Sequence, residues 1–138
     1  MKLKKILFSL ILLFSFNVEA KFISYYNEVL STVKLYCRAD QYFNPKSKTL
    51  LGAALELPVI GICETDRESY FKIYLDNAYW DGASEDYRYE LMLHECTHCL
   101  FFENHSSNPN HYMYYQIRDL TKEKSKEQFI EYLKKRCN

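Results

Sequence analysis

The chain has 138 residues, and its 18 lysines and arginines balance its 18 aspartates and glutamates, so the formal net charge is zero. A chain of this length is sufficient for one domain with a modest hydrophobic core. Without a basic excess it lacks the electrostatic signature of nucleic-acid binding, so we expect no nucleic-acid partner.

The first twenty residues have the pattern of a secretory signal peptide. Residues 1–5 are basic, residues 6–16 are apolar, and Val18-Glu19-Ala20 fits a small-x-small cleavage site. The apolar run is shorter than the roughly 20 residues of a membrane-spanning helix. We therefore expect a mature, monomeric protein of residues 21–138 that forms a single domain. It would be exported to a bacterial periplasm or secreted, with no membrane anchor after signal cleavage.

The mature part opens with a predicted packing helix over residues 22–37, because apolar residues recur there every three or four positions. A loop over residues 40–48 is expected next. Two apolar segments, 50–57 and 59–63, are predicted as short strands separated by Pro58.

A clearer strand is predicted over residues 70–76, where Phe71, Ile73 and Leu75 alternate with more polar neighbours. If this strand lies at a sheet edge beside a cleft, its free backbone groups could pair with an extended peptide substrate. An ordinary edge strand is the alternative.

The second half is predicted to be mainly helical. Residues 77–82 read as a turn, and Ser84 is the expected N-cap of a helix over residues 85–101. Residues 103–110 form a polar loop. Ser125 and Gln128 have the spacing of a capping box for a C-terminal helix. The predicted fold class is therefore α+β, with a short mixed sheet between the packing helix and the later helices.

The mature part contains all five cysteines, and an exported chain of this size favours disulfides. An odd number leaves one cysteine unpaired, and two bridges can be drawn among five in fifteen ways. The pairing stays open, although a bridge through Cys137 would hold the terminal helix. Cys96 and Cys99 fall mainly on the packing side of their helix, so we interpret them as core or disulfide residues rather than metal ligands.

The stretch His94-Glu95-Cys96-Thr97-His98 is the strongest chemical signal in the sequence. On a helix, His94 and His98 lie one turn apart on one face, so both imidazoles can reach a single zinc ion. Glu95 then lies beside the open coordination position. There it could take a proton from a zinc-bound water, which is the arrangement of a catalytic site.

A third ligand must come from elsewhere, and His105 in the polar loop is the nearest candidate. A solvated loop histidine is the simpler interpretation. A second possibility takes the ligand from the terminal helix, and a third casts Cys63 as a deformylase-type ligand, although export fits that poorly. The candidates on the terminal helix are Glu123, Glu127 and Glu131.

Residues 71–115 resemble the metzincin-type zinc peptidases, and particularly the short metallopeptidases of bacteria and phages. The resemblance rests on a strand ending Leu75-Asp76, Trp80, Leu93, His94-Glu95-x-x-His98-Cys99, His105 and Met113.

The sequence departs from the longer-studied metzincins, whose motif is HExxHxxGxxH. Phe101 occupies the glycine position and Asn104 the third histidine position, so His105 is displaced by one residue. The short family has the longer spacing, which retains His105. Asn104 is expected to adopt the left-handed conformation that the glycine would have supplied.

The resemblance implies that His94, His98 and His105 bind one Zn²⁺ ion and that Glu95 activates water. Met113 would belong to the turn beneath the metal, and Tyr115 would stabilise the oxyanion. The expected function is thus an exported zinc metalloendopeptidase acting on a peptide or protein. The alternative is a non-catalytic exported module, stabilised by zinc or disulfides, that binds a partner through its aromatic surface. Glu95 argues against this alternative, because a purely structural zinc site needs no base.

Overall fold

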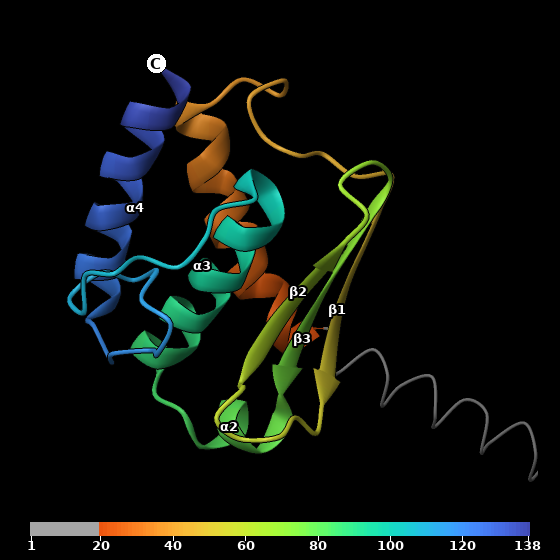
Figure 1. Cartoon of the computed structure of the whole chain (residues 1–138), viewed down its shortest axis with the longest axis vertical. Helices are drawn as coiled ribbons and strands as arrows, with labels where there is room; N and C mark the ends of the chain where they lie inside the picture. The colour runs from red at the N-terminus through yellow and green to blue at the C-terminus, as the bar shows by residue number, and fades with distance from the viewer. Residues whose placement is uncertain (1–19) are drawn as a thin grey trace, which may run out of the picture.

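The computed structural model describes residues 20–138 (Figure 1). The predicted signal peptide lies outside these residues except for Ala20. The described part is α+β, as expected, with four helices and three strands. After an N-terminal helix whose described part is residues 20–36, the elements are β1 (Ser47–Ala53), β2 (Gly61–Thr65), β3 (Tyr70–Asp76), α2 (Asn77–Gly82), α3 (Glu85–Phe101) and α4 (Lys122–Cys137).

The three strands form one mixed sheet in the order β1-β3-β2. β1 pairs in parallel with β3, and β2 pairs antiparallel with β3. The strand predicted over residues 70–76 is confirmed, including the buried side chains of Phe71, Ile73 and Leu75. It is central rather than at an edge, however, so the expectation that it borders a cleft is wrong. An alternating pattern reports which face of a strand is buried and contains no information about its lateral neighbours.

The boundaries of the other two strands differ from their predictions, and residues 77–82 form a helix instead of a turn. Asp76 explains part of this difference. Its carboxylate accepts hydrogen bonds from the N–H groups of Leu55 (2.9 Å) and Tyr79 (2.8 Å). The same side chain therefore caps α2 and holds residue 55 after β1 has ended, although residues 54–57 are apolar enough to suggest a longer strand.

The N-terminal helix, α3 and α4 lie together on one side of the sheet (Figure 1). The core forms where these helices meet each other and the buried face of β3. Trp80 of α2 is 1% exposed and makes an edge-on contact with Phe22, their ring centroids being 4.9 Å apart. No helix within residues 20–138 is both long and apolar enough to cross a membrane.

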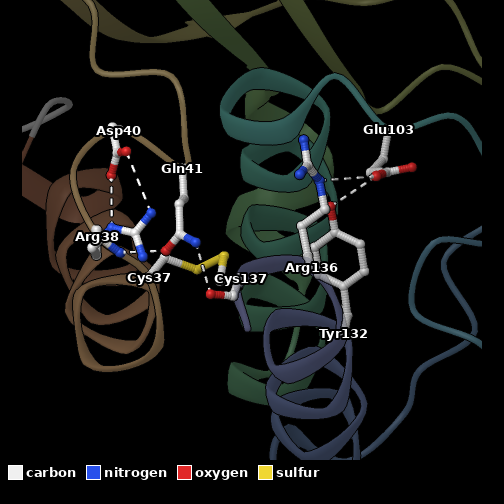
Figure 2. Close-up of a disulfide and its surroundings, with 8 residues drawn as sticks. All are labelled: Cys37, Arg38, Asp40, Gln41, Glu103, Tyr132, Arg136 and Cys137. Carbon is white, nitrogen blue, oxygen red and sulfur yellow. Dashed lines mark hydrogen bonds and ion pairs between the residues drawn. A yellow bond between two sulfur atoms is a disulfide. The ribbon is translucent and has the colours of Figure 1, made fainter.

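Two disulfides are present, and the unpaired cysteine is the buried Cys96. Cys37–Cys137 joins the end of the N-terminal helix to the end of α4, which confirms the favoured role of Cys137 (Figure 2). Cys63–Cys99 joins β2 to α3. A bridged Cys63 is unavailable as a deformylase-type ligand. The two bridges are consistent with an oxidising environment.

The start of the terminal helix differs from its prediction. Thr121 is the N-cap of α4, and its hydroxyl accepts from the N–H of Lys124 (3.2 Å). Ser125 is fully buried inside the helix. Gln128 reaches out of the helix: its side chain donates to the carbonyl of Asn110 (2.8 Å) and accepts from the N–H of Tyr112 (2.9 Å). These tertiary contacts replace the predicted capping box and secure the loop that precedes α4.

Candidate metal centre

The buried helix α3 holds the first two histidines in place. Ser84 is its N-cap, as predicted, and its hydroxyl accepts from the N–H of Tyr87 (3.2 Å). The helix ends at Phe101, also as predicted. His94 and His98 are one turn apart, and their ring centroids lie 4.7 Å from each other. Because neighbouring residues along α3 are buried in the core, the helix has little freedom to rotate these two imidazoles away.

His105 joins them because the chain reverses after α3. Phe102 has a left-handed backbone (φ 58°, ψ 30°), and its N–H donates to the carbonyl of His98 (3.1 Å). The residue that takes the place of the missing glycine is therefore Phe102 and not Asn104, contrary to our prediction. The ring of His105 lies 5.1 Å from that of His94 and 4.8 Å from that of His98, centroid to centroid. One ring nitrogen of each histidine lies within 4.8 Å of the other two.

The loop that carries His105 is fastened to the segment around Met113. The N–H of Ser106 donates to the carbonyl of Met113 (2.7 Å), and Ser106 forms an isolated parallel bridge with Tyr114. Met113 is 4% exposed, and its own N–H donates to Nδ1 of His111 (3.0 Å). This segment therefore lies directly beside the histidine cluster, and His111 supports it without belonging to the cluster.

The hydrogen bonds of the two helical histidines leave their other nitrogens free for a metal. Nδ1 of His94 lies 2.9 Å from the carbonyl oxygen of Tyr112, and Nδ1 of His98 lies 2.6 Å from that of Glu103. Carbonyl oxygens only accept, so each Nδ1 carries the proton and each Nε2 of a neutral ring has a lone pair. Burial lowers the pKa of His94 to about 4, and burial also lowers the pKa of His98, so both rings are neutral at pH 7.

The Nε2 atoms of His94 and His98 are 3.1 Å apart. Two facing lone pairs repel unless a cation lies between them. Two nitrogens at about 2.1 Å from one tetrahedral ion would be about 3.4 Å apart, which is close to this separation. The donor set of three imidazoles therefore fits a borderline metal ion such as zinc.

Glu95 is only 5% exposed and lies against the edge strand β2. Burial raises the pKa of its carboxyl group to about 8, because the charged form loses solvation. The contact with β2 is at Gly61: a Cβ atom added there would lie 2.5 Å from Oε1 of Glu95. The absence of a side chain at residue 61 therefore provides the space that this carboxyl group occupies.

The histidines and Glu95 line a cavity of about 900 Å³. Tyr115, which is 60% exposed, lines the same cavity, so the structure places all five predicted site residues around one space. The alternative ligands on α4 do not join them, because those glutamates are exposed and outside the histidine cluster. Further lining residues include Leu57, Pro58, Val59, Ile60, Gly61, Ile62, Cys63, Arg67, Tyr79, Tyr87, Leu91, Phe102, Glu103 and Ile117.

Several residues that shape this site have no signal in the sequence. Tyr112 and Glu103 contribute through their backbone carbonyls, and side-chain identity gives no signal for such a role. Gly61 is one of three glycines in the chain, and only the fold shows that it faces Glu95. Arg67 follows β2 in a polar turn, and only the fold shows that it lines the cavity.

The fold and site define a small α+β protein, stabilised by two disulfides, with a three-histidine cluster that could hold a metal ion. Comparisons of the chain with protein-family models, with curated proteins and with solved structures give no match. The resemblance to metzincins therefore stays a prediction.

Proposed function

We propose that the protein is an exported, zinc-dependent metallopeptidase with a zincin-like site, in which His94, His98 and His105 bind one zinc ion. The observation that carries the proposal is the convergence of these three histidines in one cavity with the buried carboxyl group of Glu95. Three protein ligands leave one position open for water or substrate, as in catalytic zinc sites. When bound, zinc would acidify a water molecule and polarise the carbonyl group of the peptide bond.

Glu95 would act as the general base. Its carboxylate would accept a proton from the attacking water and then deliver that proton to the nitrogen of the leaving amine. A carboxyl group with a raised pKa holds a proton more readily than an exposed one, which suits the second step. A nearby cation would lower this pKa and so favour the ionised form that the first step needs.

The substrate would lie along β2. Among the described residues this strand pairs only with β3, so its other edge has free backbone N–H and C=O groups there, and residues 61–63 line the cavity. An extended peptide could add to this edge and bring one of its bonds to the histidine cluster. β2 thus takes the role that the sequence had suggested for β3. Tyr115 would stabilise the oxyanion, and Met113 would support the site from below.

The alternative is a non-catalytic binding module whose zinc or disulfides only stabilise the fold. Cys37–Cys137 already joins the end of the N-terminal helix to the end of α4, and Cys63–Cys99 joins β2 to α3. A fold secured in this way has less need of a structural metal. The cluster is therefore better explained by chemistry at the cavity than by stabilisation.

Metal removal tests the proposal directly. We expect the purified protein to contain about one zinc ion per chain and to cleave a fluorogenic peptide library, because zinc supplies the activated water. Chelation followed by gel filtration should abolish cleavage, and one equivalent of zinc should restore it. Elemental analysis and initial rates provide the two measurements. Equal cleavage by the chelated and reconstituted proteins would reject the proposal.

Gly61→Ala is expected to reduce hydrolysis by about 10²-fold without loss of zinc, since misplacing a catalytic group by about 1 Å has effects of this size. The new methyl group would displace the Glu95 carboxylate, whereas the histidines are held by other contacts. The measurements are kcat/KM and zinc content. Gly82→Ala is the matched control, because a Cβ atom at residue 82 meets no atom within 4 Å. Unchanged kcat/KM in Gly61→Ala would show that β2 does not position Glu95.

A further inference from the structure

We propose that Arg67 forms a carboxylate-binding subsite of the cavity, so that the protein selects peptides with an acidic residue close to the cleaved bond. The inference rests on the proposed peptidase function and adds a substrate class to it. Arg67 follows β2, the strand along which the substrate would lie, and it lines the same cavity as the histidines.

Arg67 is held against the residue that reverses the chain after α3. Its guanidinium carbon lies 5.1 Å from the ring centroid of Phe102, within the range of a cation–π interaction. The Phe102 ring in turn contacts that of Phe43, with centroids 5.4 Å apart. The positive charge therefore lies over an aromatic residue four positions after His98, at the end of the metal-binding helix.

The turn that carries Arg67 is organised by its neighbours. The Asp66 carboxylate accepts hydrogen bonds from the N–H groups of Glu68 (3.0 Å), Ser69 (2.8 Å) and Tyr70 (2.9 Å). Thr65 accepts from the N–H of Arg67 itself (2.9 Å). These bonds maintain the left-handed backbone of Arg67 (φ 61°), a conformation that arginine rarely adopts. The guanidinium group is thus presented by an ordered turn, which reduces the entropy lost on binding.

The charge of Arg67 is unpaired within residues 20–138, where no carboxylate oxygen lies within 4.0 Å of its side-chain nitrogens. Glu103 also lines the cavity, but its carboxylate accepts from the hydroxyl of Tyr132 (2.9 Å) and lies 4.0 Å from Nε of Arg136 (Figure 2). The carboxylate of Glu103 is therefore engaged by residues of α4. Among the described lining residues, Arg67 is the only lysine or arginine.

The length of β2 determines how far the Arg67 subsite lies from the bond that would be cleaved. Glu95 contacts Gly61 at the start of this strand, and Arg67 follows its last residue, Thr65, by two positions. At about 3.3 Å per residue, the strand spans roughly 13 Å from its first to its last Cα atom. A peptide paired with β2 and cleaved opposite Glu95 would thus bring a residue within about four positions of the cleaved bond near Arg67.

A carboxylate is the ligand that suits the guanidinium group of Arg67. The planar guanidinium group of an arginine can donate two parallel hydrogen bonds to the two oxygens of an aspartate or glutamate side chain. The lining on the other side of Gly61 from Arg67 is apolar, because Leu57, Val59 and Ile60 precede β2 and line the cavity. Peptides with an acidic residue on one side of the cleaved bond and apolar residues on the other would match both ends.

The test compares fluorescent peptides that carry glutamate or glutamine at successive positions on both sides of an apolar pair. Binding is measured by anisotropy with zinc-loaded Glu95→Gln protein, which holds peptides without turning them over, and hydrolysis is measured with zinc-loaded protein that retains Glu95. We expect up to about fivefold tighter binding of glutamate than of glutamine at one position, in keeping with an exposed ion pair. The preference should vanish in Arg67→Gln, and Arg67→Glu should favour lysine there instead. Arg38→Gln, a change at an arginine outside the cavity, should leave it intact.

Equal binding of glutamate and glutamine peptides at every position would overturn the subsite, as would a preference that persists in Arg67→Gln. Hydrolysis without any acidic preference would overturn the subsite alone and leave the peptidase proposal standing. An Arg67-dependent preference in binding, without hydrolysis by the protein that retains Glu95, would support the subsite and reject the peptidase proposal. The two ideas can therefore fail separately.

Discussion

Glu95→Ala is expected to reduce peptide hydrolysis by about 10²- to 10⁴-fold, the usual contribution of a general base. Zinc content should be unchanged, because the three histidines that would bind the ion are not altered. Removal of a buried carboxyl group also relieves its desolvation, so the variant is expected to fold. Zinc per chain and kcat/KM for a fluorogenic peptide are the measurements.

Glu85→Ala is the matched control for this variant. Glu85 lies in the first turn of the same helix, its side chain is 70% exposed, and it contacts Lys122 rather than the cavity. Its replacement should leave zinc binding and hydrolysis unchanged. If the unmodified protein and Glu95→Ala both contained full zinc and had the same background activity, the enzyme hypothesis would be untenable. The binding module would then be the better interpretation.

His105→Ala is expected to lose both zinc and hydrolysis, because two histidines alone form an incomplete zinc site. Changes that only disturb groups around the ligands already weaken metal binding by about 10- to 100-fold, so removal of a ligand should weaken it at least as much. Competition with a chromophoric chelator measures the zinc affinity. His105 is exposed and lies in a loop, so its replacement should affect the stability of the metal-free fold little.

Two variants serve as controls for His105→Ala. His111→Ala should retain zinc, although loss of the bond between Nδ1 and the N–H of Met113 should reduce the free energy of unfolding by about 1 kcal/mol. Glu127→Ala should retain both zinc and stability, because Glu127 is exposed on α4. Tight zinc binding by His105→Ala would exclude His105 as a ligand.

The features that local sequence determined are those governed by interactions between near neighbours. The bounds of α3 and its Ser84 cap follow from helical periodicity and a single hydrogen bond, and both were predicted. The alternation along β3 likewise identified its buried face. On α3 the spacing of His94 and His98 fixed their common face, because successive helix turns superimpose residues four apart.

Tertiary structure decided everything that depends on contacts distant in sequence. Strand order placed β2 rather than β3 at the cavity, and the pairing of Cys63 with Cys99 was one of many possible connections. Thr121 is the N-cap of α4 in place of the predicted capping box of Ser125 and Gln128. The side chain of Gln128 instead binds the loop before α4, where it accepts from the N–H of Tyr112.

The same division applies within the site. Sequence indicated His105 by its spacing, but its approach to the other two histidines depends on the left-handed Phe102 and on the bond from Ser106 to Met113. No sequence pattern indicates that Gly61 lies against Glu95 or that Arg67 lies over Phe102. Local propensity describes a residue and its close neighbours in the chain. The chemistry of this cavity depends instead on which surfaces of β2, α3 and the following loop are packed together.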